Sequence, residues 1–393
     1  MFLQNSETYD LKLDQACIFL QPASTGYING TFHIYLPESK SFKRIRLQLL
    51  SVLKLYAAKS KFSNAFGVNI RLDSPRDGFL IQNDRERITV ISEQDIGSSK
   101  CLPSFQLPAG NYEFPFSIPL PGRMLETVTC QRQKYHTYHV VAKFERRFRG
   151  NFTISRPIRI YDHPNLWVDH QLISTPVTVE RQTGQDIQYC IILPDSKIPF
   201  ASKFPVKCYF SPLSKNLKIG SVSVSVLERH RLQSDATAAE SAMHNTFKIH
   251  TSSTSTIFQS EHNCTHQTLE TLATEDDIPS AEWCLSLPVQ LPDSFDLASQ
   301  SISTRDIQIS HELMVQAKFH NTETSTPIMV EEKIPFSIYM TPAVIDEDGT
   351  IHGKDIESFK AYECPPPAYG KHKYDAILLD WAECLRESSL LSR

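Results

Sequence analysis

The feature that most constrains this chain is a period-two alternation of apolar and polar residues that recurs from residue 28 to residue 339. In the run 28–36, Ile28, Phe32, Ile34 and Leu36 alternate with Asn, Thr, His and Tyr. The segment 221–226 reads Ser-Val-Ser-Val-Ser-Val. This spacing sends alternate side chains to opposite faces of an extended backbone, so that one face is buried and the other solvated. The pattern predicts β-strands almost everywhere before residue 342.

The runs are short and separated by Pro, Asn and Ser, which is typical of antiparallel sandwiches. Proline outnumbers glycine by 24 to 13, which disfavours a helical protein and glycine-lined phosphate loops. A chain of 393 residues accommodates two such sandwiches. We therefore predict an all-β protein of two immunoglobulin-like antiparallel β-sandwich domains, residues 1–162 and 163–342, with a tail at 343–393. Further alternating runs support the division: Ile45–Leu49, Tyr112–Ile118, Tyr138–Phe148, Ile154–Ile160, Asp186–Leu193, Val206–Phe210, Ile219–Leu227, Trp283–Leu291, Ile307–Phe319 and Ile328–Tyr339.

One segment of the second domain does not fit the strand pattern. Residues 234–282 contain sixteen Ser or Thr among forty-nine residues, with eight acids and one lysine. We expect a mobile Ser/Thr-rich insert at about 232–282, between two strands of that domain. Its composition suits phosphorylation but does not specify it.

The sharpest motif lies in the tail, at Pro366-Pro367-Ala368-Tyr369. Consecutive prolines favour polyproline II, so little conformational entropy is lost when the segment docks. The form P-P-x-Y suits WW domains, in which proline rings enter an aromatic-lined groove and the tyrosine fills a neighbouring pocket. Pro366, Pro367 and Tyr369 are therefore the predicted WW-domain-binding residues; the competing interpretation is a plain proline-rich spacer.

Beyond this motif, the tail predicts one helix over 374–391. Its apolar residues Ile377, Leu378, Trp381 and Leu385 fall on one stripe. The helix could dock on a sandwich or on a partner.

A basic run lies in the first domain. Residues 123–159 carry nine basic and two acidic residues, although the whole chain has a net charge of −4. Lys143, Arg146, Arg147 and Arg149 are the candidate contact residues for anionic lipid headgroups or for an acidic or phosphorylated protein segment. The alternative is an ordinary solvated sheet face. Nucleic acid is not expected, because the chain is acidic and carries no recognisable binding module.

No catalytic, cofactor or metal motif emerges. The chain lacks G-x-S-x-G, a P-loop and G-x-G-x-x-G. His262, Cys264 and His266 are close enough to suggest a metal, but no fourth ligand is evident. Glu331-Glu332 is interpreted as a charge pair on a wet surface. We therefore expect no enzyme activity, no cofactor and no metal; a β-sandwich hydrolase would be the alternative class.

The start of the chain lacks the basic and apolar regions of a secretory signal, and no apolar run reaches the eighteen residues of a membrane span. Nine cysteines, none in a C-x-x-C pair, indicate reduced thiols. These features predict a cytoplasmic protein.

The run 107–121, Leu-Pro-Ala-Gly-Asn-Tyr-Glu-Phe-Pro-Phe-Ser-Ile-Pro-Leu-Pro, resembles the signature of the arrestin N-terminal domain. Residues 138–142 lie where that family has a Y-x-V-x-A strand. In the second half, 212–219 with the following Ser-Val strand and Glu228, and the run 309–315, are similar to arrestin C-terminal domains. With the P-P-x-Y tail, the chain looks most like a fungal arrestin-related trafficking adaptor, or α-arrestin.

The resemblance implies an arrestin fold and an adaptor function. The body would recognise a membrane transporter or receptor, and Pro366, Pro367 and Tyr369 would recruit a WW-domain HECT-type ubiquitin ligase. The cargo would then be ubiquitinated, internalised and sorted, and such adaptors are commonly ubiquitinated themselves. The protein would be recruited peripherally to the plasma membrane, endosomes or Golgi. These adaptors often carry two or more P-P-x-Y motifs, whereas this tail has one. The alternative is an arrestin-fold endosomal sorting subunit, similar to that of retromer, with no ligase role.

Overall fold

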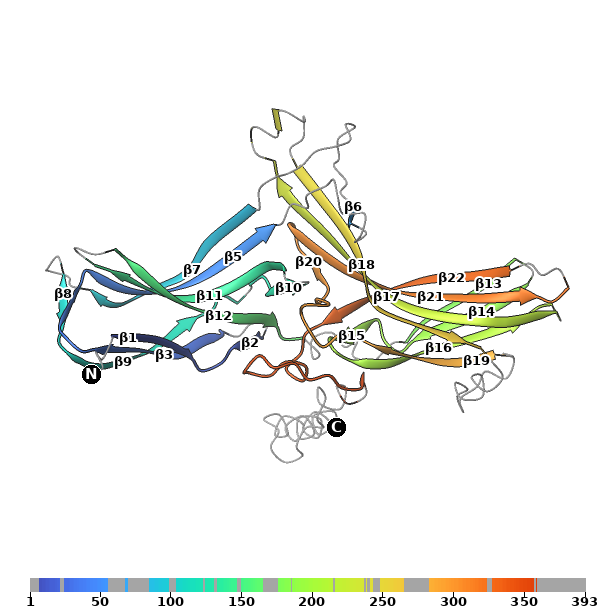
Figure 1. Cartoon of the computed structure of the whole chain (residues 1–393), viewed down its shortest axis with the longest axis horizontal. Helices are drawn as coiled ribbons and strands as arrows, with labels where there is room; N and C mark the ends of the chain where they lie inside the picture. The colour runs from blue at the N-terminus through green and yellow to red at the C-terminus, as the bar shows by residue number, and fades with distance from the viewer. Residues whose placement is uncertain are drawn as a thin grey trace, which may run out of the picture.

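The computed structural model describes most of both predicted domains. The described residues are 7–21, 25–55, 68–69, 85–98, 104–122, 124–130, 133–146, 150–164, 176–184, 186–214, 216–236, 238, 241–242, 248–264, 283–323, 327–356 and 358. They form two β-sandwiches that lie end to end (Figure 1). The predicted all-β architecture is confirmed.

In the first sandwich, a three-stranded sheet packs on a sheet that contains β2, β12, β11, β5 and β7 in that order. The three-stranded sheet has the order β1-β3-β9, β10 pairs with β11, and β4 pairs with β8. The strands are β1 (Thr8–Leu13), β2 (Cys17–Leu20), β3 (Tyr27–Leu36), β4 (Lys40–Phe42), β5 (Arg44–Leu55), β7 (Arg85–Ser98), β8 (Phe105–Leu107), β9 (Gly110–Pro119), β10 (Val128–Cys130), β11 (Gln133–Glu145) and β12 (Phe152–Asp162).

The second sandwich pairs a four-stranded sheet, in the order β13-β14-β16-β19, with a larger sheet in the order β15-β22-β21-β17-β18-β6. In the larger sheet, β20 also pairs with β21. The strands are β6 (Val68–Asn69), β13 (Val177–Thr183), β14 (Ile187–Leu193), β15 (Lys197–Pro199), β16 (Lys203–Pro212), β17 (Leu217–Asp235), β18 (Lys248–Asn263), β19 (Trp283–Gln290), β20 (Ile302–Ser303), β21 (Ile307–Asn321) and β22 (Pro327–Tyr339).

The alternation in the sequence becomes the burial pattern of the strands. In β3 and β21, buried and more accessible residues alternate along almost the whole strand. Phe32 and Phe144 lie in the first core, and Phe210 and Phe319 in the second. Each fully buried aromatic or aliphatic side chain stabilises its sandwich by roughly 1.5–3 kcal/mol of transfer free energy.

Residues from before the predicted domain boundary near residue 162 contribute to the second sandwich in two places. Val68 and Asn69 of the first half pair with Ser253 and Ser252 of β18, and so extend the second sandwich. Cys17 and Tyr161, also from the first half, belong to the core of the second sandwich. In addition, β2 pairs with β12, and β15 with β22, in parallel, which differs from the purely antiparallel prediction.

The predicted mobile insert at about 232–282 is wrong at its start and in its middle part, because residues 232–235 belong to β17. Residues 248–263 form β18, which pairs with β17 from Ser221 to Asp235. Successive Ser and Thr residues differ little in hydrophobicity, so this segment shows no apolar–polar alternation and the pattern could not reveal the strand. β-Branched Thr nevertheless fits a pleated surface well. Residues 265–282 lie outside the described residues.

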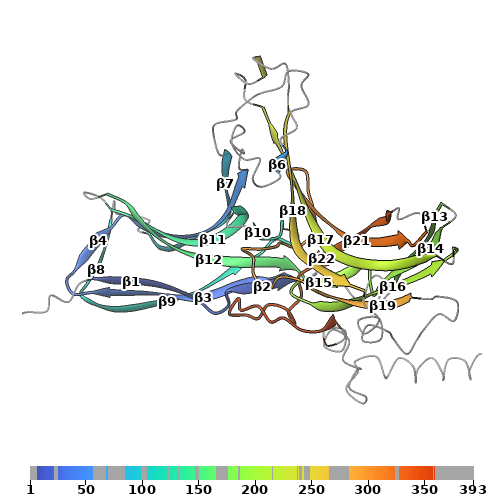
Figure 2. The ribbon, with the colours of Figure 1, turned by 45° about the vertical axis from the view of Figure 1, so that its right-hand side comes forward.

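The ends of β5 and β7 and the ends of β17 and β18 rise together where the sandwiches meet, and we call this region the crest (Figure 2). At the crest, Arg87 Nη2 lies 2.9 Å from Asp306 Oδ2, joining the first sandwich to the second. Below it, an apolar cluster unites both domains: Leu53, Val128, Tyr135, Leu232, Ile307 and Ile309. The sandwiches therefore share a hydrophobic seam.

We expect Ile307→Ala to lower the free energy of unfolding by about 2–5 kcal/mol, because Ile307 is fully buried in this seam and truncation leaves a cavity. Urea unfolding followed by intrinsic fluorescence measures the change. Met329→Ala is the control, because Met329 is 56% exposed and should shift stability by about 0.5 kcal/mol or less. Equal losses of unfolding free energy in the two variants would contradict the conclusion that the hydrophobic seam stabilises the protein.

Candidate functional site

The candidate sites, two of them predicted from the sequence, lie in three places. Pro366, Pro367 and Tyr369 lie outside the described residues, as do Arg147 and Arg149 of the basic run and the predicted helix over 374–391. Lys143 and Arg146 are described, at the end of β11. A third candidate is a buried polar network between the sandwiches, whose central residue, Glu228, entered the sequence analysis only through the resemblance to arrestin C-terminal domains.

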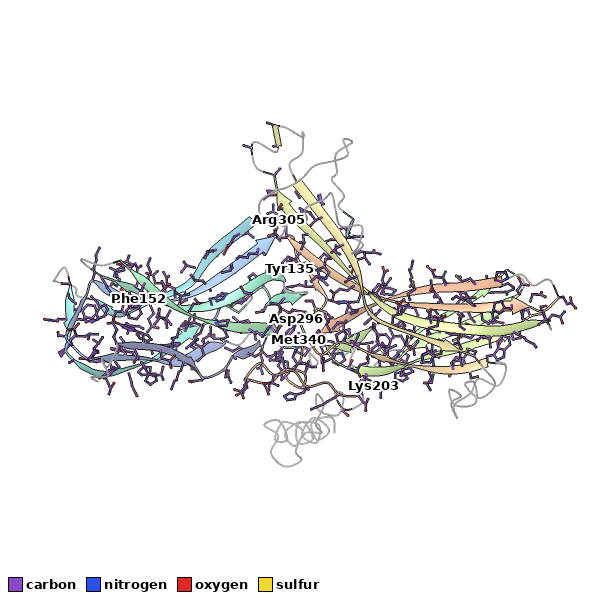
Figure 3. All side chains as sticks on the ribbon, in the orientation of Figure 1. Tyr135, Phe152, Lys203, Asp296, Arg305 and Met340 are labelled. Atoms are coloured by element: carbon purple, nitrogen blue, oxygen red, sulfur yellow. The ribbon has the colours of Figure 1, made fainter. Side chains whose placement is uncertain are left out.

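Arg146 is held by an aromatic cluster at the far end of the first sandwich. Its guanidinium carbon lies 4.3 Å from the centre of the Phe152 ring, a cation–π contact. Phe152, which Figure 3 labels in the first sandwich, in turn stacks on Phe144, with ring centres 4.2 Å apart. The Arg146 backbone N–H donates to Asn151 Oδ1 at 3.2 Å. The side chain is thus positioned by packing as well as by charge.

Beside Arg146, the carboxylate of Glu7 accepts hydrogen bonds from Lys40 Nζ and from Tyr9 Oη. The hydrogen bond from Lys40 holds the pKa of Glu7 below its ordinary value. Burial, reinforced by Glu7, raises the pKa of Tyr9 to about 12. Acidic and basic groups are therefore mixed at this end of the sandwich.

Lys143 lies on the outer face of the sheet, directly across from Arg46 of β5. Arg46 donates to Glu145 and, at 2.6 Å, to Glu93 of β7. The hydrogen bond from Arg46 lowers the pKa of Glu145. Long-range strand pairing thus places acids from β7 next to the basic run, and the face around Lys143 carries both signs of charge.

The network between the sandwiches centres on Glu228 of β17, whose side chain is fully buried. Glu228 Oε1 lies 2.6 Å from His230 Nε2, and Oε2 lies 3.1 Å from His311 Nε2. The backbone N–H of Ser299 donates to Oε2 at 2.8 Å. Burial opposes ionisation of Glu228, but the hydrogen bonds from both imidazoles outweigh it, so its pKa lies well below the ordinary value.

This network reaches the first sandwich through Tyr135. Tyr135 Oη lies 3.0 Å from His230 Nδ1, and Figure 3 shows Tyr135 at the junction of the two domains. Nearby, Gln300 Nε2 donates to the carbonyl oxygen of Thr127 at 2.7 Å and to Glu126 Oε2 at 3.3 Å. Burial raises the pKa of Glu126. Polar contacts therefore set the relative orientation of the domains beside the apolar seam.

One signal in the sequence could have found this network. Val222, Val224 and Val226 occupy the buried face of β17, and Glu228 and His230 continue the same alternation. An ionisable residue at a position that the alternation assigns to the buried face requires a hydrogen-bonding or charged partner, because an unpaired buried charge lowers the stability of the fold. The partner His311 lies on β21 and follows only from the strand register.

Two of the three residues that suggested a metal site, His262 and Cys264, make contacts within and beside β18. His262 Nε2 contacts Ser260 Oγ at 3.0 Å, Cys264 Sγ lies 3.7 Å from the His262 carbonyl oxygen, and His266 is outside the described residues. Within the part of the chain that the structure describes, no group of three or more His, Cys, Asp or Glu side chains is arranged so that it could hold a metal ion.

The interpretation of Glu331-Glu332 as a wet charge pair is wrong for Glu332. This residue is 7% exposed, because it lies on the inner face of β22 between Val330 and Ile334. Its carboxylate accepts from Tyr189 Oη at 3.0 Å and lies 3.3 Å from Arg181 Nε.

Comparison with known proteins agrees with this architecture. Residues 183–343 match the family described as "Arrestin (or S-antigen), C-terminal domain". The second sandwich, residues 163–342, therefore matches the arrestin C-terminal domain over almost all of its length.

Two of the relatives that it matches come from Emericella nidulans and Aspergillus terreus. The chain is 27% identical over 387 residues to the HECT-type ubiquitin ligase-interacting protein creD of Emericella nidulans, covering 95% of this chain and 60% of that protein. It is 26% identical over 389 residues to the probable HECT-type ubiquitin ligase-interacting protein creD of Aspergillus terreus, covering 95% and 62%. The chain thus spans about 60% of the length of these relatives. Among its described residues, no helix has the length and apolar character needed to cross a bilayer.

We expect Glu228→Ala to destabilise the protein by about 3–5 kcal/mol at pH 7, because it leaves two buried imidazoles and a buried N–H without their acceptor. Chemical unfolding at neutral pH measures the loss. Glu312→Ala is the matched control: its partly exposed pair with Arg229, at 3.4 Å, should contribute at most about 1 kcal/mol.

The same variant tests the pH dependence. A carboxyl with a lower pKa in the folded state contributes stability that is complete above its unfolded pKa, about 4.3, and is lost as the pH falls toward the folded value. The stability difference between wild type and Glu228→Ala should therefore shrink progressively below about pH 4.5. A difference that stays constant from pH 7 to pH 3.5 would contradict an ionised Glu228.

Proposed function

We propose that this protein is an adaptor that links membrane transporters or receptors to a WW-domain HECT-type ubiquitin ligase, and so promotes ubiquitination, endocytosis and sorting of the cargo. The observation that carries the proposal is the Pro366-Pro367-Ala368-Tyr369 sequence in a chain that matches, over 95% of its own length, proteins named as HECT-type ubiquitin ligase-interacting proteins. A coat subunit without a ligase role would have no use for this motif.

The adaptor performs no bond-making step in this mechanism. Ubiquitin transfer requires ligase and substrate to be held together, and tethering raises their effective concentration without a reacting group in the adaptor. Two sandwiches joined by an apolar seam and a buried polar network suit this task, because cargo bound to one rigid body stays near a ligase bound to the tail. Ubiquitin would be attached to the cargo and also to the adaptor itself.

The adaptor would work in the cytoplasm, recruited peripherally to the plasma membrane, endosomes or Golgi. Lys143 and Arg146 are the described members of the surface proposed to meet anionic lipid or an acidic cargo segment, with Arg147 and Arg149 completing the set. The stacking of Arg146 on Phe152 supports this assignment, because it holds one guanidinium in place before any partner arrives.

We expect Tyr369→Ala to abolish binding of the ligase WW domains and to retain the cargo at the cell surface, because the tyrosine pocket is left empty while the prolines remain. A pull-down with purified WW domains and a cargo-internalisation assay measure the two effects. Tyr362→Ala, a tail tyrosine outside the motif, is the control. Undiminished WW-domain binding by Tyr369→Ala would refute the proposal.

We expect Lys143→Glu to weaken binding to phosphatidylserine-containing vesicles about thirtyfold, since each basic residue near an anionic surface contributes about 1 kcal/mol and the reversal changes two charges. Vesicle sedimentation at fixed ionic strength measures the change, and binding of an acidic cargo peptide is measured in parallel. The control is Lys218→Glu, an exposed lysine on β17 of the other sandwich. If both bindings persist, the surface is a solvated sheet face only.

A further inference from the structure

The chain does not leave the body when β22 ends. Residues 341–356, which we call the clasp, continue along the junction of the sandwiches, on the side opposite the crest (Figures 1 and 2). Val344 and Ile345 are buried at its beginning, and Ile356, 3% exposed, is buried at its end. All three belong to the core of the second sandwich. The clasp is therefore anchored at both ends.

Between its anchors, the clasp contacts the first sandwich. The carbonyl oxygen of Glu347 accepts from the backbone N–H of Ala16 at 2.6 Å and from that of Cys17, the first residue of β2, at 3.2 Å. Gly349 has a φ of 84°, a left-handed conformation that favours glycine, and an added Cβ would lie 3.8 Å from Ala16 Cβ. The clasp thus bridges the two domains by main-chain hydrogen bonds.

Its turn is held by side chains of its own. Asp346 Oδ1 accepts from the backbone N–H groups of Asp348 at 3.1 Å and Thr350 at 2.8 Å. Asp346 Oδ2 lies 2.9 Å from His352 Nε2, and this hydrogen bond lowers the pKa of Asp346. The backbone N–H of His352 donates to the carbonyl oxygen of Val344 at 2.7 Å, closing the loop.

The last residues return to the second sandwich. The N–H of Lys203, at the start of β16, donates to the carbonyl oxygen of Lys354 at 3.0 Å. A Cβ on Gly353 would lie 3.1 Å from the carbonyl oxygen of Ala201, so the backbones approach closely there. Figure 3 places Lys203 on the lower side of the second sandwich, near this attachment. Ile356 is the last buried anchor before the described part ends at residue 358.

We infer that the clasp sets the point from which the WW-binding motif is presented, and thereby confines the ligase WW domain to the clasp side of the body, near Lys203. This inference rests on the proposed ligase-recruiting function of Pro366, Pro367 and Tyr369. From Ile356 to Pro366 there are ten residue steps, 366 − 356, which can span at most about 35 Å in any conformation.

We call the segment between the last anchored residue and Pro366 the tether. Without the clasp, the tether would begin at Met340 and have twenty-six steps, 366 − 340, spanning up to about 90 Å. Effective concentration falls roughly as the −3/2 power of tether length. Shortening the tether from twenty-six steps to ten therefore raises the concentration of the bound WW domain near the clasp about fourfold.

The test uses the whole 393-residue chain and one purified WW domain that carries a lysine-reactive cross-linker, with the cross-link yield at Lys203 measured by mass spectrometry. In Ile356→Asp, the buried charge should drive the end of the clasp off the body and open the hydrogen bonds to Lys354 and Glu347. The next fully buried anchor is then Ile345, so the tether lengthens from ten to twenty-one steps and the yield should fall about threefold. Asp348→Ala, which removes an exposed acid of the same turn, is the matched control and should leave the yield unchanged.

A second variant leaves the body untouched, and so covers the case in which Ile356→Asp does not fold. Eleven Gly and Ser residues inserted after Ser358 lengthen a clasp-anchored tether from ten to twenty-one steps, which again predicts about a threefold loss of yield at Lys203. If the tether instead began at Met340, the insertion would lengthen it from twenty-six to thirty-seven steps and the loss would be only about 1.7-fold.

Binding of the WW domain, measured by calorimetry, should be unchanged in all of these variants. Equal cross-link yields in wild type and Ile356→Asp, or a loss of about 1.7-fold on insertion, would overturn the role of the clasp. Absence of WW-domain binding by the wild-type protein would instead overturn the proposed function, so the two failures are distinguishable.

Discussion

The buried carboxylate of Glu228 is the contact on which the arrangement of the two sandwiches depends. An anion can occupy a fully buried position only if donors surround it, and here His230, His311 and the Ser299 N–H supply them. Each imidazole uses its second nitrogen elsewhere, His230 with Tyr135 and His311 with Ser301 Oγ at 2.8 Å. The register of β17 against β21 and the docking of the first sandwich are therefore linked by one hydrogen-bond network.

A fixed domain arrangement gives the molecule two distinct sides. The ends of β5, β7, β17 and β18 form the crest on one side, and the clasp lies on the other. The clasp depends on the same interface, because Glu347 can accept from Ala16 and Cys17 only while the sandwiches keep their orientation. In the proposed adaptor function, this geometry would separate a ligase bound through Pro366, Pro367 and Tyr369 from the crest while keeping both on one body. Proximity is then supplied by architecture and tether length.

The fold was largely predictable from local pattern, and the candidate sites much less so. Alternation placed most strands of both sandwiches, because burial of one sheet face imposes a period of two. It missed β18, whose Ser and Thr carry little hydrophobic contrast, and it misjudged Glu332, which follows the buried face of β22. Ser221 and Ser225 were expected on a wet face, yet they are 9% and 5% exposed.

The amino-acid sequence by itself determined the all-β class, the two-sandwich architecture and a four-residue motif suited to WW domains, because each depends on residues close together in the chain. Only the tertiary structure decided which charges meet. Arg46 and Glu93 are 47 residues apart, Glu228 and His311 are 83 apart, and strand register alone brings them together. The clasp is likewise a tertiary fact: nothing local to residues 341–356 indicates that Ala16 and Cys17 will supply its hydrogen-bond donors, since these lie more than three hundred residues away.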